Sequence, residues 1–138
     1  MSEIEGRRPI GARNAPWAQK AARALARSAV TPNQISAASI VFAAIAGIAL
    51  WRAGAADGWP RMALFLAGAA CCQGRLLCNL FDGMVAIEGG RASKDGPFWN
   101  EFPDRIADLS ILVGAGYGVA ETGVFGAELG WAAAAMAI

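Results

Sequence analysis

Acidic and amide side chains recur at helical spacing in two places in the second half of the sequence. Asn79 and Asp82 are three residues apart, and Gly83 leaves that side of a helix open beside Asp82. Further along, Asp104 and Asp108 are four residues apart, which places them one helical turn from each other on a single face. If both segments are helical, two oxygen-rich edges can face each other.

Like charges one turn apart repel, and such a cluster near a low-dielectric region needs a cation, a proton or an arginine to persist. All the available donors are oxygens of Asp, Glu or Asn, which suit Mg²⁺ or Mn²⁺ better than a thiolate-seeking ion. The spacing therefore indicates a divalent-metal site formed by Asn79, Asp82, Asp104 and Asp108. A solvated acidic loop paired with neighbouring cations is the other interpretation, and spacing alone does not decide between them.

Thiol and imidazole chemistry is disfavoured. The chain has no histidine, and Cys71, Cys72 and Cys78 lie in an apolar run without zinc-ligand spacing or a disulfide pattern. We expect the three cysteines to be small core residues.

The elements that must position the acidic residues are apolar helices. Hydrophobic residues make up 56% of the 138 residues, and a spanning helix needs about 20 mostly apolar residues. The first apolar run follows a capping sequence, Thr31-Pro32-Asn33-Gln34. Four runs are candidate spans: residues 35–51, 62–80, 109–120, and 124 onward. Gly114 and Gly118 are four residues apart in the third run, which favours close packing of another helix there. The pattern predicts an all-α integral membrane protein, a multi-span helical bundle embedded over residues 31–138.

Basic residues are concentrated before the first span. Six of the 12 lie there: Arg7, Arg8, Arg13, Lys20, Arg23 and Arg27. Such a segment marks the cytoplasmic side of a membrane protein and attracts anionic lipid, so we expect membrane lipids and no nucleic acid as partners. Residues 1–30 are predicted to be a cytoplasmic basic segment whose amphipathic helix lies on the membrane, with Trp17, Ala21 and Leu25 on its apolar face.

The acidic pattern resembles a known family signature. Asp82-Gly83-Met84-Val85-Ala86, followed by Asp104-Arg105-Ile106-Ala107-Asp108, resembles the CDP-alcohol phosphatidyltransferases, whose signature reads D-x-x-D-G-x-x-A-R and then G-x-x-x-D-x-x-x-D. The resemblance implies a membrane enzyme of about six helices, so the sequence is expected to be truncated at its apolar end. It also implies transfer of a phosphatidyl or related group from a CDP-linked lipid donor to an alcohol acceptor, with release of CMP and two Mg²⁺ or Mn²⁺ ions.

The resemblance also implies roles for individual residues. Asp82 and Asp104 match metal-binding aspartates, and Asp108 matches the last aspartate, a metal ligand and the catalytic base. Asp82, Gly83 and Ala86 would contact the CDP group.

Four features depart from the family pattern. Asn79 stands at the first aspartate, Ile87 replaces the arginine, and Asn100 replaces the second glycine. The gap between the half-motifs is also four residues longer than usual. An amide at a ligand position keeps an oxygen but removes one negative charge, which weakens binding of two metals.

Two arginines are predicted to contact a phosphate of the donor or the acceptor. Arg75 lies inside an apolar run, where a charge is costly enough to need a partner, and Arg105 lies between the two acidic positions of the second half-motif.

The sequence thus predicts a phosphotransferase of phospholipid biosynthesis in the inner membrane, with its active site facing the cytoplasm. A homodimer is compatible with it. Two alternatives stay open, a noncatalytic relative that binds nucleotide-lipid and a fragment of a cation-binding transporter. Acids at the end of a span, rather than at mid-membrane, favour the enzyme.

Overall fold

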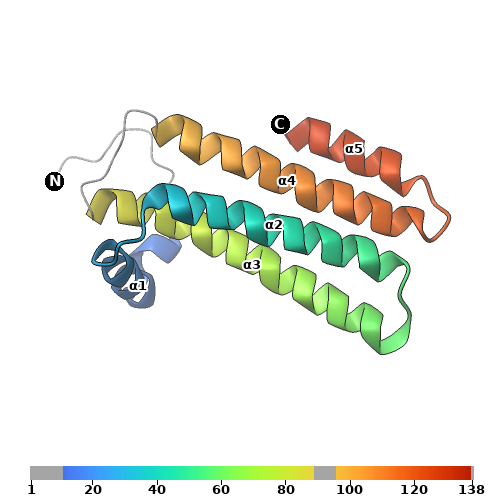
Figure 1. Cartoon of the computed structure of the whole chain (residues 1–138), viewed down its shortest axis with the longest axis horizontal. Helices are drawn as coiled ribbons and strands as arrows, with labels where there is room; N and C mark the ends of the chain where they lie inside the picture. The colour runs from blue at the N-terminus through green and yellow to red at the C-terminus, as the bar shows by residue number, and fades with distance from the viewer. Residues whose placement is uncertain (1–10, 89–95, 138) are drawn as a thin grey trace.

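A computed structural model describes residues 11–88 and 96–137, and for residues 11, 12, 88 and 96–100 it describes the backbone alone. The described residues form helices and contain no strand, which confirms the all-α class. The elements, shown in Figure 1, are η1 (Gly11–Asn14), α1 (Pro16–Ala26), α2 (Pro32–Gly54), α3 (Gly58–Glu88), α4 (Gly96–Ala120) and α5 (Gly126–Ala137).

Helix α2 begins at the predicted capping sequence. The Thr31 hydroxyl accepts a hydrogen bond from the Gln34 amide at 3.3 Å, and the Gln34 side-chain oxygen accepts one from the Thr31 amide at 2.9 Å. Pro32 occupies the first turn, where its missing N–H costs nothing. These reciprocal bonds define where the first candidate span starts.

Helix α2 contacts both α3 and α4, and α5 packs on α4 (Figure 1). The buried positions of α2 are small, among them Ala43, Ala46 and Gly47. Gly47 and Gly114 face each other so closely that a Cβ on either would overlap the backbone of the other helix. The predicted packing role of Gly114 is therefore confirmed, and Gly118 makes a similar approach to Leu50.

Two helices, α2 and α3, are long and apolar enough to cross a membrane. Large apolar side chains on them, such as Val41, Ile48 and Leu66, are exposed on the protein surface. Among the described residues only these two helices meet that criterion, against the four spans expected. The 12 residues of α5 extend about 18 Å, which is shorter than a bilayer core.

Helix α1 packs against α3, but not through the residues predicted for its apolar face. Ala18 and Ala22 are fully buried in a cluster with Leu80 and Met84 of α3. Trp17 is 55% exposed and meets the edge of the Phe81 ring, with 6.2 Å between the ring centroids. Trp17, Ala21 and Leu25 were predicted to face the membrane, and this stays a prediction, because α1 packs on α3 through the neighbouring Ala18 and Ala22.

Candidate functional site

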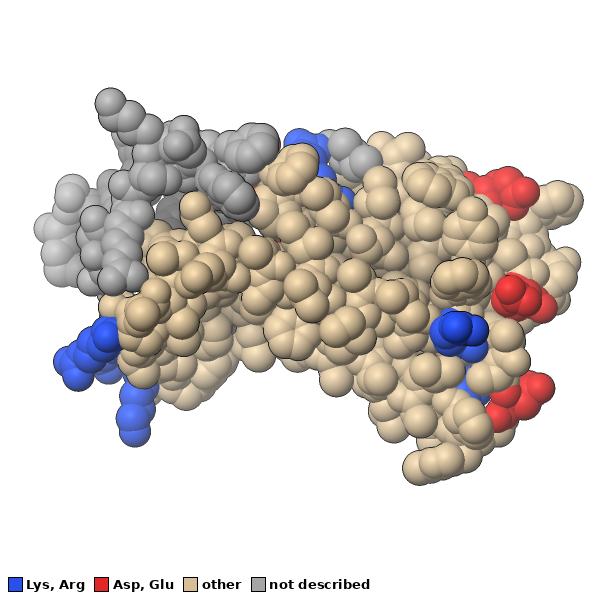
Figure 2. Space-filling model, in the orientation of Figure 1, with Lys and Arg blue, Asp and Glu red and all other residues tan. Residues whose placement is uncertain are grey.

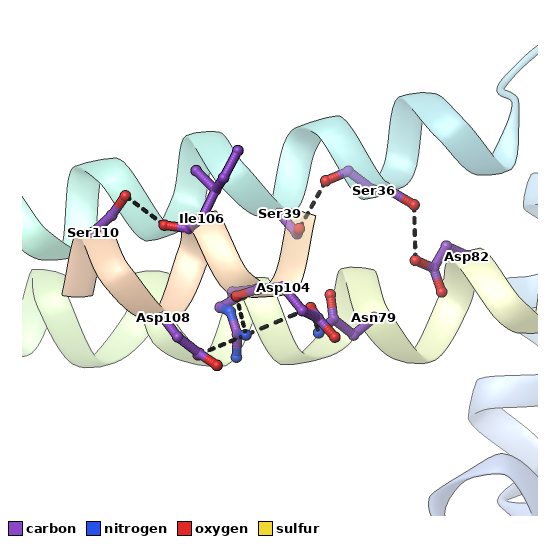
Figure 3. A network of polar contacts seen from close by, with 9 residues as sticks. Ser36, Ser39, Asn79, Asp82, Asp104, Ile106, Asp108 and Ser110 are labelled. Atoms are coloured by element: carbon purple, nitrogen blue, oxygen red, sulfur yellow. Dashed lines mark hydrogen bonds and ion pairs between the residues drawn. The ribbon is translucent and has the colours of Figure 1, made fainter. Parts of the chain in front are cut away.

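The polar residues of the two half-motifs gather between α3 and α4, at the end of the bundle where α2 begins (Figures 1 and 3). Arg75 and Asn79 are four residues apart on α3, and Asp104 and Asp108 are four apart on α4. Both pairs therefore lie one turn apart along their helices, so that two side chains of α3 can meet two of α4.

The contacts join the half-motifs directly. The Asn79 side-chain amide donates a hydrogen bond to Asp104 Oδ1. Arg75 Nη2 lies 2.8 Å from Asp108 Oδ1 and 3.5 Å from Asp104 Oδ1, and it also donates to the Asp104 backbone carbonyl at 3.4 Å. One guanidinium thus bridges two carboxylates that would otherwise repel each other.

These ion pairs differ from a surface salt bridge. The Arg75 side chain is 11% exposed, whereas Asp104 and Asp108 are about 40% exposed, so the pairs are partly shielded from solvent. Arg105, by contrast, pairs with Glu101 of its own helix at 3.9 Å, with both side chains exposed. An exposed pair of that kind contributes about 0–1 kcal/mol, while reduced solvation strengthens the attraction around Arg75.

Asp82 is held separately from the other carboxylates. It is buried, and its Oδ2 accepts a hydrogen bond from the Ser36 hydroxyl of α2 at 2.9 Å. Its Oδ1 accepts one from the Gly83 amide at 2.5 Å. Ser36 is thus a site residue that sequence reasoning missed. The available signal was its place in the run, where Ser36 and Ser39 are polar residues one turn apart on an apolar helix.

The predicted metal ligands are only partly brought together. Asn79, Asp104 and Asp108 meet around Arg75, while Asp82 is engaged by Ser36. Within the part of the chain that is described, no three Asp, Glu, Cys or His side chains converge as metal ligands do. The oxygen donors are of the kind that Mg²⁺ and Mn²⁺ bind. Their arrangement does not fit two such ions, because a cationic side chain already lies between two of the carboxylates.

Gly83 and Ala86, predicted to contact CDP, lie one turn apart on α3, and both are partly exposed beside the buried Asp82. Ile87 stands at the family's arginine position and is 46% exposed. Because isoleucine is uncharged, this position supplies no cation.

No family model, no curated protein and no solved structure matches this chain. The interpretation of the site therefore rests on the contacts between α3 and α4 and on the motif resemblance. Three features need a functional explanation: joined half-motifs, a buried carboxylate, and an arginine bridging two carboxylates.

Proposed function

We propose that this protein is a membrane phosphotransferase similar to the CDP-alcohol phosphatidyltransferases. It transfers a phosphatidyl or related phospho-alcohol group from a CDP-linked donor to an alcohol and releases CMP. The observation that supports this most is the hydrogen bond from Asn79 to Asp104, which joins two half-motifs 25 residues apart in the sequence. Helices that met in another register would leave the half-motifs on unrelated surfaces.

The reaction needs a proton acceptor close to the attacking alcohol. The alcohol oxygen attacks the phosphorus that carries the phosphatidyl group, the P–O bond to CMP breaks with its electron pair, and the alcohol proton passes to a carboxylate. Asp104 and Asp108 are both open enough to take that proton, since about 40% of each side chain is exposed. Asp82 is buried against Ser36 and is better suited to orienting the donor.

Two assignments of the base follow from the motif. In the first, Asp108 is the last aspartate and the gap between the half-motifs is four residues longer than usual. Moving the second half-motif four residues earlier gives Gly96-x-x-x-Asn100-x-x-x-Asp104, which restores the usual gap and makes Asp104 the last position. The contact between Asn79 and Asp104 favours the second register, because the first and last positions of the motif are then in direct contact across α3 and α4.

Measuring CMP release tests the function and both assignments. The full chain in lipid vesicles is incubated with CDP-diacylglycerol and a panel of alcohols, with Mg²⁺, with Mn²⁺ and with a chelator. We expect release with at least one acceptor, and a loss of about 10²- to 10⁴-fold when the base is changed to asparagine. Asp104→Asn and Asp108→Asn are compared with Asp57→Asn, a control far from the site whose side chain is almost fully exposed.

A noncatalytic function is the second candidate, and the Arg75 bridge is the observation that favours it. Arg75 neutralises carboxylates that a catalytic metal would otherwise need. If the wild-type chain binds CDP-lipid but releases no CMP with any acceptor or metal, the protein is a nucleotide-lipid binder and the catalytic proposal fails.

The proposed location is the cytoplasmic membrane, crossed by α2, α3 and α4, with the site at its cytoplasmic face. Lys20, Arg23 and Arg27 are exposed on or next to α1, at the end of the bundle that holds the site. Exposed acidic residues, Asp57, Glu121 and Glu128, lie at the opposite end (Figure 2). A positive end on the cytoplasmic side agrees with the charge bias of membrane proteins.

A further inference from the structure

Arg75 makes every ionic contact described in the cluster. Its Nη2 contacts both carboxylates and the Asp104 carbonyl, while its Nε is buried without a hydrogen-bond partner among the described atoms. An arginine of this kind, inside a candidate span and 11% exposed, is retained only where its charge has a local use. The use seen here is to hold α3 and α4 together through two acidic side chains.

Asn79 complements Arg75. A family-like aspartate at position 79 would put a third negative charge beside Asp104, whereas the amide brings a hydrogen-bond donor to the same carboxylate. Arg75 and Asn79 together direct donors at Asp104 Oδ1, an oxygen that a metal ligand would turn toward a cation. The asparagine at position 79 and the guanidinium of Arg75 thus both reduce the repulsion between negative charges around Asp104.

We propose that Arg75 is the resident cation of this site. Its guanidinium supplies the positive charge that Asp104 and Asp108 need, so these carboxylates stay together without a bound metal. A divalent cation binds the two carboxylates only by displacing Arg75. This inference rests on the proposed function for the identity of the site, but not on turnover.

The competing explanation is that Arg75 positions the two carboxylates as metal ligands. The two explanations predict opposite changes in the affinity for a divalent cation when Arg75 is replaced. Removing a competing charge strengthens the binding of a divalent cation, whereas removing a positioning residue weakens it.

The affinity for Mn²⁺ is measured by electron paramagnetic resonance on the substrate-free full chain in nanodiscs. We expect Arg75→Gln to bind Mn²⁺ about tenfold or more tightly than wild type, because removing a positive charge a few ångströms away has a large effect in a poorly solvated site. Arg75→Lys keeps the charge and should retain wild-type affinity. Arg52→Gln, the matched control at an exposed arginine near the far end of α2, should also leave it unchanged. Unchanged or weaker binding by Arg75→Gln overturns the proposal.

Folding of the variants gives a second test. Arg75→Gln should melt below wild type in a chelator and recover in Mn²⁺, because the metal replaces the missing charge. If Arg75→Gln does not fold, the double variant Arg75→Gln/Asp108→Asn removes both charges of the 2.8 Å pair and should fold without metal. A double variant that also fails to fold shows that Arg75 serves packing, and the proposal is wrong. A chain that binds Mn²⁺ as expected but releases no CMP overturns the proposed function and leaves this inference standing.

Discussion

Asp82 is a buried carboxylate whose position depends on a hydroxyl from another helix. The Ser36 hydroxyl has one proton and two neighbouring acceptors, Asp82 Oδ2 at 2.9 Å and the Pro32 carbonyl at 3.2 Å. The charged acceptor is the closer and forms the stronger bond. Ser36 thus stabilises a group that would be costly to bury without a donor.

Replacing Ser36 tests that role. Ser36→Ala leaves Asp82 Oδ2 without its donor, and we expect the free energy of unfolding to fall by about 1–3 kcal/mol. Ser110→Ala is the control, because the Ser110 hydroxyl bonds only the Ile106 carbonyl of its own helix, at 2.8 Å. Reversible unfolding in mixed micelles measures both variants. Equal losses of unfolding free energy in the two variants would show that the hydrogen bond from Ser36 to Asp82 adds no more stability than a bond within one helix.

Asn79 is the second residue whose chemistry can be tested. Asn79→Asp removes the donor to Asp104 and adds a negative charge, so the melting temperature in a chelator should fall. Mn²⁺ should restore much of that loss, since three carboxylates then exceed the charge of Arg75. Asn33→Asp is the matched control, since Asn33 is exposed in the first turn of α2, where a negative charge is favourable. A fall that Mn²⁺ does not reverse would count against metal binding here.

The helices are held together mainly by close backbone approach and by side chains at their ends. Arg61 at the start of α3 donates to the Ala53 and Gly54 carbonyls, at 3.1 and 3.2 Å, and so closes the end of α2. A cation there also suits the negative end of the helix dipole. In the middle of the bundle, Gly47 and Gly114 bring α2 and α4 into backbone contact. The polar cluster therefore depends on the α2–α4 spacing, because α4 carries Asp104.

The same substitution at two glycines measures how much that spacing matters. A Cβ at Gly114 would overlap the Gly47 backbone, so Gly114→Ala should lower the free energy of unfolding by about 2 kcal/mol or more. Gly68→Ala meets the Leu50 side chain at 3.4 Å and the Ala46 carbonyl oxygen at 3.7 Å, both ordinary contacts. It should be neutral or stabilising by up to about 1 kcal/mol, because alanine favours helix. If both variants were equally stable, close packing of α2 on α4 would be unnecessary.

Charge divides the whole molecule into two ends. The end with α1 carries exposed basic residues and the polar cluster, while the α2–α3 and α4–α5 connections carry exposed acidic residues, with Arg52 and Arg61 beside them (Figure 2). If the protein lies in the membrane as proposed, we expect this asymmetry to orient the site toward the cytoplasm and toward anionic lipid headgroups.

Cysteine accessibility tests that orientation. In a chain whose Cys71, Cys72 and Cys78 are replaced by alanine, Ala29→Cys and Ala55→Cys place single thiols at exposed positions of opposite ends. An impermeant reagent applied outside intact cells should label Ala55→Cys and spare Ala29→Cys until the membrane is opened. The reverse pattern would invert the topology and put the site on the other side.

Local patterns were enough to predict most of the elements. The capping box at Thr31, the two apolar helices long enough to span, and the packing face at Gly114 are all present as expected. The cap and the apolar runs depend on residues within a few turns of one another, which a sequence displays directly. The packing face was predicted from the local spacing of two glycines, although its partner Gly47 lies on another helix. The spacing of Asn79 with Asp104 on facing helices was also anticipated as two acidic edges that meet.

The identity of each partner across the helices could not be read in this way. Ser36 and Asp82 are 46 residues apart, and Arg75 and Asp104 are 29 apart, so their contacts depend on how α2, α3 and α4 slide and rotate against one another. That register follows from glycine contacts and side-chain packing over the whole bundle, and a shift of one helical turn of about 5.4 Å would pair different residues. Sequence spacing therefore indicated that a cation was needed beside the acidic residues. Only the packed helices show that Arg75 supplies it.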